Sequence, residues 1–136
     1  MATNQSLIRL KRRLFRLPKA VRDAAMKQAL LSAHDLAGEI AAKAPKDEGD
    51  LAASVRIEGN ADGTRWYIKA GGKVTTKPVR KGQSATYDYA LGQEFGREGM
   101  PAQPFFWPTY RRRKTRVKRE IREAAVKAAK DSVNRG

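Results

Sequence analysis

The sequence predicts an α+β fold in which a small antiparallel sheet packs with a long N-terminal helix and a C-terminal helix. Two observations on spacing indicate it. Apolar residues recur every three or four positions over residues 19–44 and again after Tyr110, as in amphipathic helices. Between these segments, short runs alternate apolar and polar residues, as half-buried strands do. A length of 136 residues suits one domain with a modest hydrophobic core.

The first expected element is a basic amphipathic helix at residues 7–17, which Pro18 ends. Its apolar stripe consists of Leu7, Leu10, Leu14 and Leu17. Residues 1–18 are therefore predicted to be a basic N-terminal arm or helix, with residues 19–136 forming a single α+β domain. The main helix is expected at residues 19–44, before Pro45, and its apolar positions are Met26, Leu30, Ala33, Ala37 and Ile40.

The middle of the chain predicts strands and connections. After an acidic turn at residues 46–50, the alternation of Leu51, Ala53, Val55 and Ile57 predicts a strand. Residues 59–64 read as a hairpin turn, and Trp66–Ile68 as the partner strand. Residues 73–86 are polar, basic and aperiodic, which predicts an exposed, mobile loop. Residues 87–95 fit either a strand or a short helix. A connector rich in Gly and Pro follows at 96–109, and a basic C-terminal helix is expected from Tyr110 onward.

The net charge of +15 is concentrated at the two ends of the chain. Residues 1–19 carry six basic groups and no acid, and residues 111–136 carry eleven basic groups and three acids. Residues 20–110 are nearly neutral, with twelve bases and eleven acids. Cationic ends on a neutral core indicate a polyanionic neighbour: nucleic acid, an acidic protein ring or an anionic membrane surface.

The candidate residues for contact with a polyanion are Arg12, Arg13, Arg111, Arg112, Arg113, Lys114 and Arg116. Phosphate contact is one interpretation of these residues, and a solvated helix face is the other. The amphipathic N-terminal stripe fits docking on a neighbouring subunit or on the chain's own core better than a membrane.

The residue types that support catalysis are sparse, so we expect no enzyme, no metal and no cofactor. The chain has no cysteine and one histidine, His34, in the middle of a helix. His34 is a candidate general base, but an ordinary helix histidine is the simpler interpretation. The acids Asp47, Glu48 and Asp50 are too few and too closely spaced for a calcium loop. The first residues lack the apolar stretch of a signal peptide, and no apolar run is long enough to span a membrane. The expected site of synthesis is the cytoplasm.

An aromatic cluster interrupts the connector before the last helix. Pro101, Pro104 and Pro108 restrict the backbone around Phe105, Phe106 and Trp107. The aromatic residues fit core packing at the base of the helix, or an anchor between subunits.

Three segments, in this order, resemble the signatures of small neck and tail-completion proteins of tailed phages. They are AKAPKDEGDLAASVRI at Ala42–Ile57, YDYALGQEFG at Tyr87–Gly96 and MPAQPFFWPTY at Met100–Tyr110. The resemblance covers roughly residues 7–130. Two positions depart from it, because Glu48 and Arg97 stand where the family usually has threonine.

The resemblance implies a virion protein of the head–tail interface, made in the cytoplasm of the host bacterium, and it brings no catalytic residues. It implies a ring of identical subunits, with six copies favoured and twelve as the alternative, in contact with other neck or tail proteins. The cationic ends would meet either DNA in the channel or acidic faces of adjacent rings. By the same resemblance, Pro45, Gly49 and Leu51 form a helix-to-strand turn, Tyr89, Glu94, Phe95 and Gly96 form a sheet edge or subunit contact, and Pro104, Phe105 and Pro108 anchor the last helix. The expected interface residues are therefore Tyr89, Glu94, Phe95, Phe105, Phe106 and Trp107. The alternative function is that of a small basic nucleic-acid-binding protein.

Overall fold

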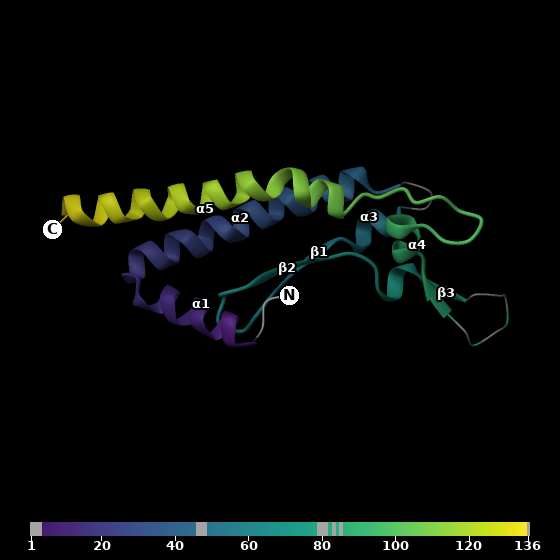
Figure 1. Cartoon of the computed structure of the whole chain (residues 1–136), viewed down its shortest axis with the longest axis horizontal. Helices are drawn as coiled ribbons and strands as arrows, with labels where there is room; N and C mark the ends of the chain where they lie inside the picture. The colour runs from purple at the N-terminus through teal and green to yellow at the C-terminus, as the bar shows by residue number, and fades with distance from the viewer. Residues whose placement is uncertain (1–3, 46–48, 79–81, 83, 85, 136) are drawn as a thin grey trace. The chain divides into compact units, whose positions relative to one another are not determined.

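The computed structural model describes residues 4–45, 49–78, 82, 84 and 86–135. The order of its elements is α1 (Asn4–Arg16), α2 (Lys19–Lys43), α3 (Asp50–Ser54), β1 (Arg56–Gly59), β2 (Trp66–Lys69), a 3₁₀ turn η1 (Lys73–Thr75), β3 (Thr76–Pro78), β4 (Thr86–Asp88), α4 (Tyr89–Phe95) and α5 (Trp107–Arg135) (Figure 1). The α+β class with long N- and C-terminal helices is confirmed. Where one sheet was expected, the strands of the described residues form two pairs, β1–β2 and β3–β4.

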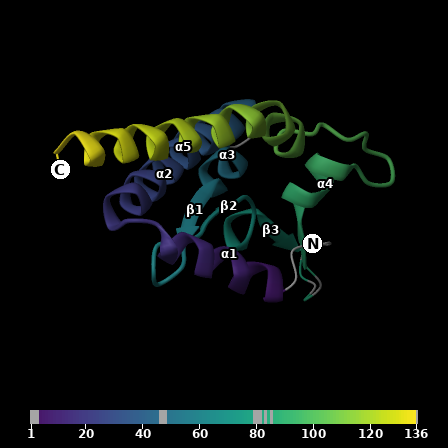
Figure 2. The same ribbon diagram turned by 60° about the vertical axis from the view of Figure 1, so that its left-hand side comes forward.

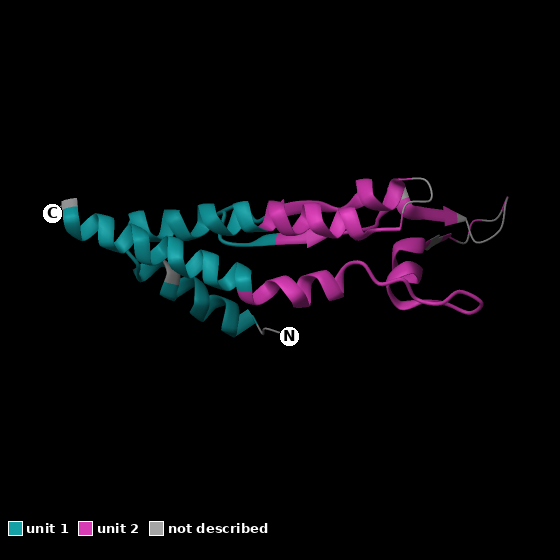
Figure 3. Cartoon of the chain, turned by 90° about the horizontal axis from the view of Figure 1, so that it is seen from above, with its two compact units in different colours: residues 1–32, 59–66, 116–136 teal, residues 33–58, 67–115 magenta. Residues whose placement is uncertain are grey.

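The chain divides into two compact units, coloured in Figure 3. Unit 1 comprises residues 1–32, 59–66 and 116–136, and unit 2 comprises residues 33–58 and 67–115. The predicted arm or helix at residues 1–18 falls within unit 1, and its separation from a domain of residues 19–136 stays a prediction.

Unit 1 contains α1, the first part of α2 and the last part of α5. Figures 1 and 2 agree that α2 lies between the other two helices. Ser32 of α2, which is almost fully buried, donates a hydrogen bond to Glu120 of α5 at 2.7 Å, and Gln28 donates one to Ser32 at 3.0 Å. A polar link thus joins the two helices within this unit.

The hydrophobic core lies in unit 2. Its buried residues come from α2 and the residue after it, from α3 and α4, and from the segment just before α5: Leu36, Ile40, Ala44, Leu51, Ala90 and Phe105. Ile68 and Ala70, at and after the end of β2, pack against this cluster. Because the buried residues come from segments far apart in sequence, the core fixes where α4 and the first turn of α5 stand.

The predicted strand at residues 51–57 is wrong over its first half. Residues 50–54 form α3, and only Arg56–Gly59 is extended. Gly49 precedes α3 with a positive φ of 79°, Asp50 supplies an acid in the first turn, and two alanines favour helix. Leu51 and Ser54, three positions apart, are the buried pair. In so short a segment, the apolar spacing fits the two-residue period of a strand and the 3.6-residue period of a helix equally well. The turn expected at Pro45, Gly49 and Leu51 therefore exists, but it leads into a helix instead of a strand.

Residues 87–95 contain both of the structures that the pattern left open. Thr86–Asp88 is β4, antiparallel to β3 with Thr76 opposite Asp88, and Tyr89–Phe95 is α4. The expectation that Tyr89, Glu94, Phe95 and Gly96 form a sheet edge is therefore wrong, because they lie on a helix and its C-cap. The predicted loop at 73–86 is also shorter, since 73–78 form η1 and β3. Residues 79–81, 83 and 85 of that loop, and 46–48 of the acidic turn, lie outside the described residues.

Candidate functional site

Glu94, at the end of α4, joins that helix to the start of α5. Its carboxylate accepts hydrogen bonds from the backbone N–H groups of Phe105 at 2.8 Å, Phe106 at 3.0 Å and Trp107 at 2.9 Å. Trp107 is the first residue of α5, and Phe105 and Phe106 directly precede it, so no helical carbonyl can reach these N–H groups. A negative charge is also favoured at that end of the helix dipole. Glu94 therefore caps α5 from another element, across the long connector visible in Figure 2.

Asp88 has a similar role at the start of α4. Its carboxylate accepts hydrogen bonds from the N–H of Ala90 at 2.9 Å, the N–H of Gly72 at 2.8 Å and the hydroxyl of Thr75 at 2.5 Å. Partial burial raises the pKa of Asp88, but these hydrogen bonds and the nearby Arg56 outweigh it, so the pKa lies below its ordinary value. Asp88 is therefore charged at neutral pH, and it fixes α4 against the segment after β2.

That segment passes close to Asp88 because residue 71 is glycine. Gly71 has a φ of 89°, and a Cβ there would lie 2.6 Å from a carboxylate oxygen of Asp88. Its N–H donates to the hydroxyl of Ser54 at 2.9 Å, and its carbonyl accepts from Arg56 at 2.7 Å. The caps by Glu94 and Asp88 and the turn at Gly71 together hold α4 and the start of α5 in place. We refer to these three features as the frame.

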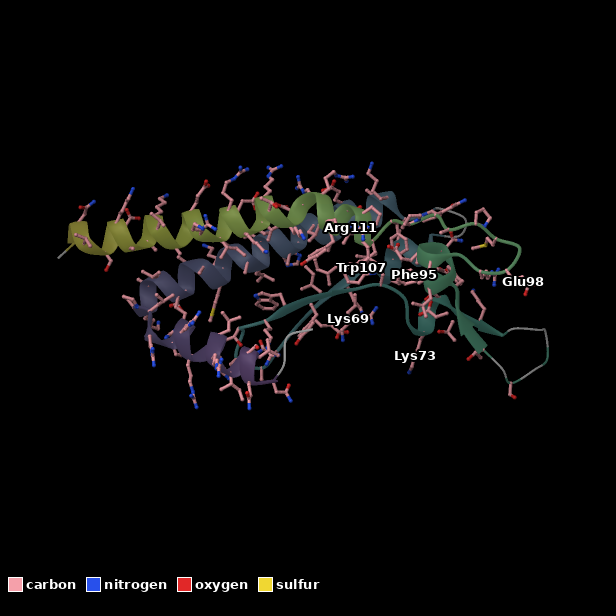
Figure 4. The ribbon with its side chains drawn as sticks, in the orientation of Figure 1. Lys69, Lys73, Phe95, Glu98, Trp107 and Arg111 are labelled. Carbon is pink, nitrogen blue, oxygen red and sulfur yellow. The ribbon has the colours of Figure 1, made fainter. Side chains whose placement is uncertain are left out.

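A mostly apolar cleft of about 340 Å³ opens on this frame, entirely within unit 2. It is lined by residues from β1, the end of β2, α4 and the start of α5, with Leu91, Phe95, Phe106 and Trp107 supplying large apolar side chains. Leu91 is 62% exposed, Phe95 66% and Trp107 43%. Figure 4 shows Phe95 and Trp107 beside each other, with Glu98 well apart on the connector.

The aromatic rings of this region stack edge to face. Phe106 and Trp107 have centroids 5.2 Å apart, and Trp107 and Tyr110 have centroids 5.8 Å apart. Such contacts hold the rings in fixed orientations although they face solvent. We refer to Leu91, Phe95, Trp107 and Tyr110 as the aromatic surface.

The predicted interface residues differ in burial and form three groups. Glu94 and Phe105 are buried, Glu94 as a cap and Phe105 in the core with 2% of its surface exposed. Tyr89 and Phe106 are half-buried, whereas Phe95 and Trp107 are exposed. Sequence reasoning did not identify Leu91 and Tyr110. The signal was present, because Leu91 lies one helical turn before Phe95 and Tyr110 one turn after Trp107.

The predicted polyanion contacts fall into two groups. Arg112 and Arg113 pair with Glu39 of α2 at 2.7 and 2.9 Å, within unit 2, and Arg116 pairs with Glu120 at 3.0 Å, within unit 1. The hydrogen bond from Arg112 lowers the pKa of Glu39, with Arg113 and Lys43 adding to the effect. The remaining four, Arg12, Arg13, Arg111 and Lys114, are exposed and have no ion pair with another described residue.

Candidate metal ligands are scattered in the part of the chain that the structure describes. His34 is exposed on α2, and no three His, Asp or Glu residues gather there closely enough for a metal ion. Among the described helices, none has the length and apolar character needed to cross a membrane. Comparisons with models of protein families, with curated proteins and with solved structures found no match for this chain.

Proposed function

We propose that this chain is a structural virion protein, a ring subunit at the phage head–tail interface that completes the tail or joins it to the DNA-filled head. The three ordered sequence segments motivate this assignment. The structural observation that carries it is the aromatic surface of unit 2. The proposal gives the chain no catalytic role, no cofactor and no place in a membrane.

The aromatic surface has the properties of a protein–protein contact. Aromatic residues are enriched in interfaces, and those that contribute most to binding are usually anchored in a well-packed surround. Phe95 and Trp107 are both exposed and lie where Glu94 fixes the end of α4 and the start of α5. A preorganised surface of this kind loses little conformational entropy when a partner covers it.

In a closed ring, each subunit uses one surface to contact a different surface of the next subunit. The aromatic surface supplies one side of such a contact. Six copies are favoured, in keeping with the tail tubes of such phages, and twelve copies, matching a portal, are the alternative. The neighbours above and below the ring are other neck or tail proteins.

Electron microscopy of the purified chain tests this proposal. We expect rings, and we expect the double variant Phe95→Ala and Trp107→Ala to remain a folded monomer. Val133→Ala, which changes an apolar residue of unit 1 that is more exposed than either, is the control and should still form rings. Rings that form unchanged in the double variant, or no rings from the wild-type chain at any concentration, would contradict the proposal.

A second experiment tests the place of the protein in the virion. Particles assembled without this protein should appear as separate heads and tails, or as particles with malformed joints. Normal, infectious particles would exclude a role at the head–tail interface.

A further inference from the structure

The positive charge of the protein is concentrated in unit 1. This unit contains sixteen Lys and Arg residues and five Asp and Glu residues, a net charge of +11. Unit 2 contains thirteen basic and nine acidic residues, a net charge of +4. The division into units thus places most of the excess charge on one set of helices.

Helix α1 presents four arginines on one face. Arg9, Arg12, Arg13 and Arg16 stand at spacings of three, one and three, so a helix of 3.6 residues per turn brings them to one side. All four are exposed, and none pairs with a carboxylate among the described residues. We call these residues the arginine face.

The opposite side of α1 is attached to the rest of unit 1. Lys11 forms an ion pair with Asp62 in the turn between β1 and β2. The ring of Phe15, one turn later, lies 4.7 Å from the guanidinium of Arg22 on α2. Since Lys11 and Phe15 are directed toward unit 1, the helical period turns the arginine face toward solvent.

We infer that the arginine face of α1 binds the phosphate backbone of duplex nucleic acid, without reading its sequence. Charge and spacing both fit this ligand. From Arg9 to Arg16 the helix rises about 10 Å, and duplex DNA carries one negative charge per about 1.7 Å of its axis. Arginine also donates two parallel hydrogen bonds to a phosphate, which suits a backbone contact.

A membrane surface would use a different side of α1. Amphipathic helices bind membranes by inserting their apolar side chains. Ile8, Leu10 and Phe15 are exposed too, at 51%, 54% and 49%, but Phe15 is in contact with Arg22. The arginine face is exposed along its whole length and has no large apolar residue. The geometry therefore favours a phosphate backbone over a lipid bilayer.

This inference does not rest on the aromatic surface or on ring formation. The arginine face belongs to unit 1 and the aromatic surface to unit 2, so each is altered by separate substitutions. A ring that fails to bind DNA would contradict this inference and leave the proposed function standing. A monomer that binds DNA would do the reverse.

The test measures binding of the full chain to a 30-base-pair duplex of arbitrary sequence by fluorescence anisotropy, over a series of salt concentrations. One variant carries Arg9→Gln, Arg12→Gln, Arg13→Gln and Arg16→Gln. If all four arginines contact phosphates, the slope of log K against log salt should become shallower by about 3–4 units. The affinity near 0.1 M salt should fall at least about tenfold.

The matched control removes the same charge from α5 of unit 1, with Lys118→Gln, Arg119→Gln, Arg122→Gln and Lys127→Gln. These residues are exposed and have no partner among the described residues. Because α2 lies between α1 and this part of α5, the control should keep nearly the wild-type slope (Figure 2). An equal loss in both variants would show that binding follows net charge, and would overturn the assignment to α1.

A second variant replaces the same four arginines with lysine, which keeps the charge and the helix. The lysine variant should keep most of the salt slope. It serves as the second test if circular dichroism shows that the glutamine variant has lost helix content. Vesicles containing phosphatidylserine are the competing ligand. Vesicle binding that Leu10→Ser and Leu17→Ser abolish, together with no measurable DNA binding at 0.05 M salt, would contradict the inference.

Discussion

Replacing Glu94 with alanine tests the frame on which the aromatic surface stands. The substitution removes the acceptor for three backbone N–H groups, those of Phe105, Phe106 and Trp107. The N–H of Phe105 belongs to a residue with 2% of its surface exposed, so water does not readily replace the lost carboxylate there. The other two N–H groups lie at a helix end that would then have no cap.

The expected cost combines two effects. An unsatisfied buried donor costs about 1–3 kcal/mol, and loss of an N-terminal cap costs about 0.5–2 kcal/mol. We therefore expect Glu94→Ala to lower the free energy of unfolding by about 2–5 kcal/mol. For a chain of this size, the midpoint of thermal unfolding should fall by roughly 10 °C. The loss is large because domains are stable by only about 5–15 kcal/mol.

Urea unfolding followed by far-ultraviolet circular dichroism measures this change, since α5 is the longest helix of the chain. Glu98→Ala is the control, because Glu98 is exposed on the connector after α4 and forms no hydrogen bond or ion pair with another described residue. Both variants remove one negative charge, but only Glu94→Ala removes the acceptor of three backbone N–H groups. Glu94→Gln keeps an acceptor but no charge, and should lie between alanine and wild type.

Equal unfolding midpoints for Glu94→Ala and Glu98→Ala would refute the reasoning. Such a result would mean that the start of α5 is held by the packing of Phe105 alone. A loss of stability with intact rings would refute a different point, namely that the cap orients the aromatic surface.

Three further predictions concern unit 2. Because the folded pKa of Asp88 lies below its ordinary value, its contribution to stability is present at neutral pH and is lost as pH falls below about 4 through the folded pKa. Urea midpoints at pH 7 and pH 3 should therefore differ less in Asp88→Asn than in wild type, and an equal difference would contradict this. Gly71→Ala should lower the free energy of unfolding by about 1–3 kcal/mol, because Gly71 has a positive φ and its added Cβ would meet the Asp88 carboxylate. Gly38→Ala is the control, because Gly38 lies in a helix with open space around it, and it should raise the free energy of unfolding by up to about 1 kcal/mol. Phe105→Ala should cost about 3–5 kcal/mol in thermal or urea unfolding, because its side chain is buried in the core, and a stable monomer that fails to form rings would contradict that role.

The helices were the part of the fold that could be predicted most closely. The expected 7–17 and 19–44 correspond to Asn4–Arg16 and Lys19–Lys43, because long amphipathic patterns and the stops at Pro18 and Pro45 are local signals. The short elements were harder. Residues 50–54 form a helix, since a five-residue segment is decided by Gly49, Asp50 and burial in the core more than by its period.

The candidate site shows the same contrast. The sequence singled out Phe95 and Trp107 but assigned Glu94 to a subunit contact. The structure directs Glu94 inward as a cap, eleven to thirteen residues away from the N–H groups it binds. No local pattern indicates a hydrogen bond over that separation, because it depends on how the connector folds back. Likewise, the pairing of Arg112 and Arg113 with Glu39 spans more than seventy residues.

By itself, the sequence determined the α+β class, the long helices and the total charge, because composition and the 3.6-residue period act locally. Only the tertiary structure decided which residues are buried supports and which are exposed. It placed Glu94 and Phe105 inside, left Phe95 and Trp107 on the surface, and gathered most of the charge in unit 1. The physical reason is that burial and pairing arise between segments distant in sequence, whose meeting no local pattern specifies.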